Sequence, residues 1–303
     1  MTHVSESTKN TMKKIFTILP FFLICFNLMK AQDTSMLELL GDDEPTTEYI
    51  TNAFKSSRVV NGQSMEMIAQ GALDFRILHR FGPVSGGAYE LFGLDQASMR
   101  LGFDYGITKN FTVGIGRSTA RKEGDGFLKY RLLHQSKGNR KMPFSLIYVG
   151  GITCDGLEWS DTSRQNLFSS RLSYYHQLVI GRKFNNYFTL QFSPTFLHRN
   201  LVPTEFDNND IYALGVGTRI KVTKRMAITA DYFYVFNRTD LATYNPLSIG
   251  IDIETGGHVF QLHLSNSIGM NERAFISDTE NQWANGEIRL GFNLSRIFQI
   301  VKK

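Results

Sequence analysis

Apolar and polar side chains alternate at every second residue along much of this chain, and this pattern limits its fold more than any other feature. In residues 287–295 the even positions hold Ile, Leu, Phe and Leu, whereas the odd positions hold Glu, Arg, Gly, Asn and Ser. The same alternation recurs in residues 99–105, 212–220, 247–254 and 260–265. Successive side chains of a β-strand point to opposite faces, so each segment predicts a strand with one apolar and one polar face.

About twelve such segments follow one another, an even number that fits a bacterial barrel whose two ends both face the periplasm. They cover residues 65–81, 97–108, 111–121, 126–136, 143–155, 169–184, 187–200, 210–223, 226–237, 246–255, 258–268 and 285–298. Most reach about 10 residues, the length that a tilted membrane strand needs. After the first thirty or so positions no apolar run reaches the roughly 20 residues of a membrane helix, so a membrane protein with this sequence must cross by strands.

The predicted connections alternate between short and long, as they do in membrane barrels with short periplasmic turns and longer outside loops. The short ones are residues 108–110, 136–141, 185–186, 223–225 and 256–257, and the long ones are 82–96, 123–126, 156–168, 201–209, 237–245 and 269–283. We therefore predict an all-β fold, a transmembrane antiparallel up-and-down β-barrel of about twelve strands. A soluble β-sandwich or soluble barrel would also alternate, but its apolar face would form a packed core.

The N-terminus has the layout of a secretory signal peptide. Lys13 and Lys14 precede an apolar run from Ile15 to Leu28, and Ala31 is a small residue at the expected cleavage point. We predict a signal peptide over residues 1–31, with Met12 as an alternative true start. The run is too short for a membrane anchor. Export through this cleaved segment would deliver the chain to the outer membrane.

Residues 32–64 do not join the strand pattern and form either a periplasmic tail or a plug inside the lumen, while residues 65–303 form the barrel. The stretch Thr46–Ser57 is compatible with a helix capped by Thr47. Residues 32–64 are also the segment through which a periplasmic protein could bind. Outer-membrane lipid and a small solute are the other predicted partners.

Charge and cysteine content exclude several classes of function. The net charge of +5 falls to +2 without residues 1–31, which hold four lysines and one acid, and no basic stripe for nucleic acid remains. Without Cys25 in the signal peptide, Cys154 stands alone, so no disulfide can form within the mature chain. The histidines have no close metal-ligand spacing. Neither a metal nor a cofactor is predicted.

The polar strand faces carry charges of both signs, and these are the predicted lumen-lining residues. They are Asp74, Arg76, Arg100, Asp104, Lys129, Arg131, Arg219, Asp231, Asp252, Glu287 and Arg289. Basic rings in a lumen favour anions, which predicts a narrow channel or small-solute porin. The alternative is a charge-paired, closed lumen in a structural or partner-binding barrel.

A distant alternative is an enzyme. His263 and Ser265 lie two residues apart on one strand face, a geometry that nucleophilic catalysis could use. The segment 263–266 resembles the His-x-Ser-Asn segment of outer-membrane phospholipases. However, Leu262 and Leu264 occupy the predicted lipid face, which turns both candidates inward, away from a lipid substrate. We therefore assign no catalytic residue and predict that the protein is not an enzyme.

Residues 53–64, with the sequence AFKSSRVVNGQS, and residues 73–82, LDFRILHRFG, carry a family resemblance. This block resembles an outer-membrane β-barrel family of Bacteroidota that is known only as a domain of unknown function. The resemblance covers the chain from about residue 45 to its end. It implies a barrel and an outer-membrane location, but it supplies no catalytic or binding residues.

Overall fold

The computed structural model describes residues 46–159, 162–163, 165–238 and 242–301. The predicted signal peptide, residues 1–31, and residues 32–45 lie outside this description. Among the described residues, no helix has the length and apolar character to span a membrane.

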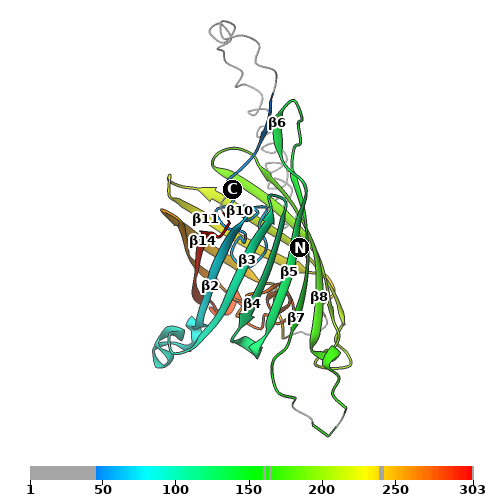
Figure 1. Cartoon of the computed structure of the whole chain (residues 1–303). Coiled ribbons are helices and arrows are strands. Elements are labelled where there is room, and N and C mark those ends of the chain that lie inside the picture. Colours follow the sequence, from blue (N-terminus) through cyan, green and yellow to red (C-terminus); the bar gives the residue numbers. More distant parts are fainter. Residues whose placement is uncertain (1–45, 160–161, 164, 239–241, 302–303) are drawn as a thin grey trace, which may run out of the picture. The chain divides into compact units, whose positions relative to one another are not determined.

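Twelve antiparallel strands close into one barrel in which sequence neighbours are also spatial neighbours (Figure 1). The strands are β2 (Ala72–Pro83), β3 (Ala97–Thr108), β4 (Phe111–Ser118), β5 (Gly124–Leu133), β7 (Ser145–Cys154), β8 (Leu172–Lys183), β9 (Phe188–Arg199), β10 (Asp210–Lys221), β11 (Met226–Val235), β12 (Leu247–Thr255), β13 (His258–Ser265) and β14 (Arg289–Gln299). The barrel closes where β14 pairs with β2, for example at Phe292 and His79. The predicted fold class and number of strands are confirmed.

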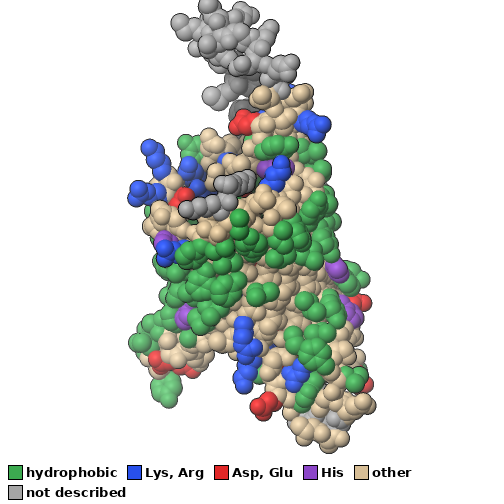
Figure 2. Space-filling view, in the orientation of Figure 1, with side chains coloured by type: hydrophobic (Ala, Val, Ile, Leu, Met, Phe, Trp, Pro, Cys, Tyr) green, Lys and Arg blue, Asp and Glu red, His purple; other side chains and the backbone are tan. Residues whose placement is uncertain are grey.

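As predicted, apolar residues of the strands face outward and polar residues face inward at alternate positions. On β13, Leu262 is 43 % exposed and Leu264 41 %, whereas the intervening His263 is 2 % exposed. Across the ladder, Leu262 is paired with Ile251 and Leu264 with Ile249, so aliphatic side chains meet on the outer surface. Figure 2 shows hydrophobic side chains over the middle of the wall and most of the visible charges toward its two ends. This distribution fits a barrel surrounded by hydrocarbon.

The longer connections at one end carry short helices, and the tight turns lie at the other end. The short helices are η3 (Val84–Gly86), η4 (Ala88–Gly93), η5 (Ala120–Lys122), η6 (Phe168–Arg171), α2 (Glu272–Ser277) and η7 (Trp283–Asn285). At the turn end, β6 (Ser136–Gly138) pairs with β1 (Thr47–Tyr49). The helix expected over Thr46–Ser57 is therefore wrong, because backbone pairing with β6 holds Thr47–Tyr49 extended.

Residues 53–68, which we call the plug segment, lie inside the barrel. Most of them are buried, including Phe54, Val60 and Gln63. The segment folds back on itself, with the Val59 amide donating to the Gly62 carbonyl at 2.8 Å and the Ser64 amide to the Ser57 carbonyl at 2.9 Å. The first strand of the barrel, β2, begins at Ala72 and not at residue 65, since the chain leaves the plug through Gly71, whose φ is +73°.

Strands β7 to β11 contribute most of the apolar side chains of the barrel interior, beside polar ones such as Gln191 and Asp231. Phe54, Val59 and Met65 of the plug segment belong to the same hydrophobic cluster as buried residues of these strands. The strand and helix members are Phe127, Ile147, Val149, Tyr175, Val179, Leu197, Ile211, Ala213, Phe233, Val235, Phe275 and Ile276. Inward-facing glycines make room for the plug: a Cβ on Gly181 would lie 2.6 Å from the Met65 sulfur. The interior is thus part packed core and part polar lumen.

We predict that Leu262→Arg destabilises the barrel in lipid vesicles by about 2–4 kcal/mol, because it brings a charge to the middle of the apolar wall. The control is Ile300→Arg, just beyond the end of β14, which should cost about 0–1 kcal/mol at the boundary. Urea unfolding of both variants measures the difference. Equal costs at the two positions would contradict the assignment of the outer surface to hydrocarbon.

Candidate functional site

The plug segment is anchored by one buried carboxylate of the barrel wall. Asp231 on β11 accepts hydrogen bonds at Oδ2 from the amides of Val60, Asn61 and Gly62, at 3.2, 2.6 and 2.9 Å. Successive backbone N–H groups that converge on one anion form a nest, and hydrogen bonds to an ionised acceptor are stronger than neutral ones. Asp231 therefore fixes the tip of the plug against β11.

Basic side chains hold the plug from the opposite wall. Arg76 on β2 donates to the Ser57 hydroxyl at 2.5 Å, and Arg80 on the same strand donates to the Asn61 side-chain oxygen. Lys129 on β5 donates to the carbonyls of Ser57 and Glu66, at 3.1 and 2.6 Å. Arg76 and Lys129 are among the predicted lumen residues. All three side chains face inward, and what they bind is the chain's own backbone and side chains.

Neutral amides complete the attachment, and the sequence analysis missed them. Gln191 on β9 donates to the Gln63 carbonyl at 2.6 Å and accepts from the Met65 amide at 3.0 Å. Gln261 on β13 donates to the Val59 carbonyl at 2.7 Å. Both glutamines occupy inward-facing positions of their strands, so the alternation of apolar and polar residues could have predicted that they face the lumen. Attention to charged residues alone left them out.

Other predicted lumen residues form buried ion pairs. Arg76 lies 3.6 Å from Asp74 and 3.8 Å from Asp104, and the Ser57 hydroxyl donates to Asp104 at 3.0 Å. Arg100 forms an ion pair with Asp125 at 2.5 Å, both nearly inaccessible to solvent.

The remaining predicted lumen residues lie toward the two ends of the barrel or contact polar neighbours in the wall. Asp252 accepts from Gln261 and Thr229 within the wall. Arg131 donates to the Met65 carbonyl, and Arg219 is buried on β10. Glu287 lies in the last long connection, where it accepts from the Gln282 amide at 2.7 Å.

A second insert, helix α2 from the connection between β13 and β14, meets the plug in the interior. Arg58 of the plug donates to Glu272 of α2 through both terminal nitrogens, at 2.8 and 3.4 Å. Each of these side chains is 1 % exposed. The two inserts are thus joined by a buried ion pair.

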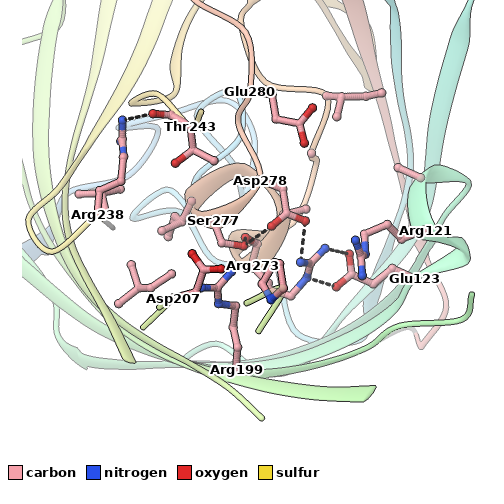
Figure 3. Close-up of a pocket in the computed structure, with 18 of the residues that line it drawn as sticks. Arg121, Glu123, Arg199, Asp207, Arg238, Thr243, Arg273, Ser277, Asp278 and Glu280 are labelled. Atoms are coloured by element: carbon pink, nitrogen blue, oxygen red, sulfur yellow. Dashed lines mark hydrogen bonds and ion pairs between the residues drawn. The ribbon is translucent and has the colours of Figure 1, made fainter. Parts of the chain in front are cut away.

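A cavity of about 450 Å³, which we call the outer vestibule, lies between α2 and the long loops (Figure 3). Arg273 of α2 lines its floor and is paired with Glu123 at 2.5 Å and Asp278 at 2.7 Å. Burial alone would raise the pKa of Asp278, but Arg273 and the hydrogen bond from Ser277 outweigh it and lower the pKa below its ordinary value. Arg273 is therefore already paired with two carboxylates.

A second cavity, of about 320 Å³, opens at the end with the tight turns. Lys55, Glu66, Asp74 and His258 are among its lining residues. The two cavities share no lining residue. Buried residues of the plug, α2 and the wall lie in the interior between them, namely Arg58, Asn61, Gln63, Arg80, Glu272 and Phe275, each no more than 2 % exposed. We call these six residues the closed layer.

His263 and Ser265 point inward, but the structure does not join them. Nε2 of His263 accepts from Arg80 at 3.3 Å, whereas the Ser265 hydroxyl accepts from Ser248 at 2.9 Å and from the Ser267 amide at 3.1 Å. No hydrogen bond connects the two side chains in the part of the chain that the structure describes. The serine is thus occupied by neighbours that cannot act as a general base.

The described residues contain no group of three or more His, Cys, Asp or Glu side chains arranged to hold a metal ion. Cys154 is a free, half-buried thiol at the end of β7.

Several solved barrels are similar to this chain. The NanC porin matches with 6 % identity and a TM-score of 0.46, covering 74 % of this chain and 98 % of that one. The KdgM porin matches with 9 % identity and a TM-score of 0.46, covering 75 % and 99 %. The COG4313 outer membrane channel from Pseudomonas putida F1 matches with 11 % identity and a TM-score of 0.47, covering 77 % and 98 %.

A search of curated proteins found no match. A family described as "Membrane bound beta barrel domain (DUF5777)" matches residues 54–298, which include most of the plug segment and all but the last residue of the barrel. The predicted resemblance to a barrel family of unknown function is thereby confirmed. The chain belongs to this family of membrane-bound β-barrel domains.

Proposed function

We propose that this protein is an outer-membrane barrel that works with a closed lumen and binds partners at its two ends. The observation that carries this proposal is the convergence of three plug amides on Asp231. With Lys129, Arg76 and Gln191 bound to the same segment, displacing the plug would break several charge-assisted hydrogen bonds at once.

The outer-membrane location rests on physical arguments. The barrel has an apolar outer belt and an even number of strands, and the sequence begins with a predicted signal peptide. In bacterial barrels of this kind, short turns face the periplasm and long loops face outward. The outer vestibule would then open to the cell exterior, and β1 and β6 would lie on the periplasmic side.

The closed layer is the main argument against a resting pore. Conduction requires a continuous wet path, and the six residues of this layer are almost inaccessible to solvent. A narrow channel remains the second candidate, because cavities of about 450 and 320 Å³ approach the layer from opposite ends. Such a channel would open only after displacement of the plug.

The periplasmic partner proposed for residues 32–64 would meet only the first part of that segment. Residues 53–64 are engaged inside the barrel, whereas Glu48 and Tyr49 of β1 are exposed. We therefore assign the contact to residues before Ala53, together with β6.

We also propose a non-enzymatic role. His263 is buried against Arg80, and Ser265 is bonded to Ser248 and Ser267, so neither is positioned to act on a lipid at the outer surface. Ser265→Ala should leave no measurable change in phospholipase assays of the refolded protein.

Planar-bilayer recording tests the closed lumen. We expect wild-type protein to give no sustained conductance steps. Asp231→Asn removes the charge that the plug amides bind. The lost hydrogen bonding is worth about 3 kcal/mol, so the frequency of channel openings should rise roughly 100-fold.

The control for Asp231→Asn is Asp125→Asn, a nearly inaccessible aspartate that binds Arg100 of β3 and has no hydrogen bond to the plug segment among the described residues. It should remain silent. Steady conductance of the wild-type protein would refute the closed-lumen function and favour the porin.

A double-mutant cycle tests the contact between plug and α2. Arg58→Met and Glu272→Met should each cost about 3–5 kcal/mol, because each leaves one buried charge unpaired, while the double variant should recover most of that loss. The partly exposed pair Lys55 and Glu254 serves as the comparison cycle, with an expected coupling of about 0–1 kcal/mol. Urea unfolding measures both cycles, and additive losses at Arg58 and Glu272 would disprove the contact.

A further inference from the structure

The outer vestibule is a built cavity with a polar floor and apolar walls. Its volume of about 450 Å³ lies within the range of small-molecule sites, roughly 300–1,000 Å³. Ile211, Val235 and Ile276 supply apolar surface, and all three side chains are themselves largely buried. A ligand that fits here needs an apolar body.

Some charged side chains around the cavity are paired with groups of opposite charge, and others are not. Arg273 is bound by Glu123 and Asp278, so these three form part of the framework (Figure 3). Asp207 accepts two hydrogen bonds from Thr204, at 3.0 and 2.8 Å, which engages one of its oxygens. Arg121 at the rim is paired with Asp155.

Arg289 on β14 differs from the other paired cations that line the vestibule. Its nitrogens donate to the side-chain oxygen of Asn281, at 3.2 and 2.9 Å, and to the Phe81 carbonyl, at 3.2 Å. All these acceptors are neutral, and in the described part of the chain no carboxylate lies within 4.0 Å of its nitrogens. The guanidinium is held in position by neutral acceptors, and Glu280 is the acidic group that acts on its charge from a distance.

Two more guanidiniums line the same cavity, and both are engaged by other residues of the chain. Arg238 donates to the Thr243 carbonyl at 2.6 Å and to Asn245, and Arg199 donates to the Asn208 carbonyl at 2.8 Å. Fixed guanidinium groups recognise carboxylate and phosphate oxygens well, because little freedom is lost on binding. Glu280, exposed at the lining, is the acidic group that a bound anion would have to avoid.

We propose that the outer vestibule binds a small organic anion, with its carboxylate or phosphate on Arg289 and its apolar body against Ile211 and Val235. This inference depends on the proposed function only in that the closed layer and α2 form the floor of the site. Binding is measured without conductance, so the failure of one proposal can be distinguished from the failure of the other.

Titration calorimetry of the full-length protein in lipid nanodiscs, with empty nanodiscs subtracted, is the test. Phenylbutyrate, phenylbutylamine and phenylbutanol share one apolar body and differ in charge, and phenyl phosphate replaces the carboxylate by a phosphate. We expect the two anions to bind at least about tenfold more tightly than the amine and the alcohol. The ratio between the two anions identifies the preferred head group.

Arg289→Gln should weaken phenylbutyrate binding about tenfold, while Arg289→Lys, which keeps the charge, should retain part of it. Arg117→Gln is the matched control, because Arg117 is an exposed arginine of β4 that does not line the vestibule. If Arg289→Gln does not fold, Arg238→Gln in the connection between β11 and β12 provides a second comparison. Equal binding of all probes, or full affinity in the variants at Arg289 and Arg238, would overturn the proposal.

Discussion

A chain segment enclosed in a barrel must find partners for its backbone polar groups, and this requirement organises the interior. Buried N–H and C=O groups without partners are costly. The plug segment has little regular structure of its own, so the strands supply those partners: Asp231 accepts its amides, while Lys129 and Gln261 donate to its carbonyls. The polar residues of the wall are therefore best understood as the complement of one particular backbone path, and this is why charges of both signs are needed.

The interior combines apolar packing with polar contacts, and the two kinds of contact contribute differently to the structure. Along β7 to β11, apolar residues such as Val149 and Phe233 pack against Val59 and Met65 of the plug as in a soluble protein core. Hydrogen bonds from β2, β5, β9, β11 and β13 fix the direction in which the plug runs. Packing contributes bulk stability through buried apolar area, whereas directional contacts to Arg76 and Arg80 select one position of the chain.

The barrel could be predicted from the sequence because parity is a local property: the alternation of Leu262, His263 and Leu264 depends only on a strand facing lipid. The plug could not be predicted in the same way. Nothing near Val60 in the sequence indicates that Asp231, 171 residues away, will bind its amide. The apolar part of the interior was missed because Val149 and Val179 lie on the inward face, where charges were expected. The vestibule depends on loops from four connections and on Arg289, whose inward position was predictable although its neighbours were not.

The seam between β14 and β2 has a bearing on how the protein is assembled. It joins the last strand of the chain to the first, so the wall cannot become continuous until nearly the whole polypeptide has been exported. The plug segment directly precedes β2 and ends up surrounded by strands that follow it. Biogenesis must therefore either wrap the sheet around a segment that is already in place or push that segment in through an open end after closure. In the first route, the buried contact between Arg58 and Glu272 would form while the seam is still open.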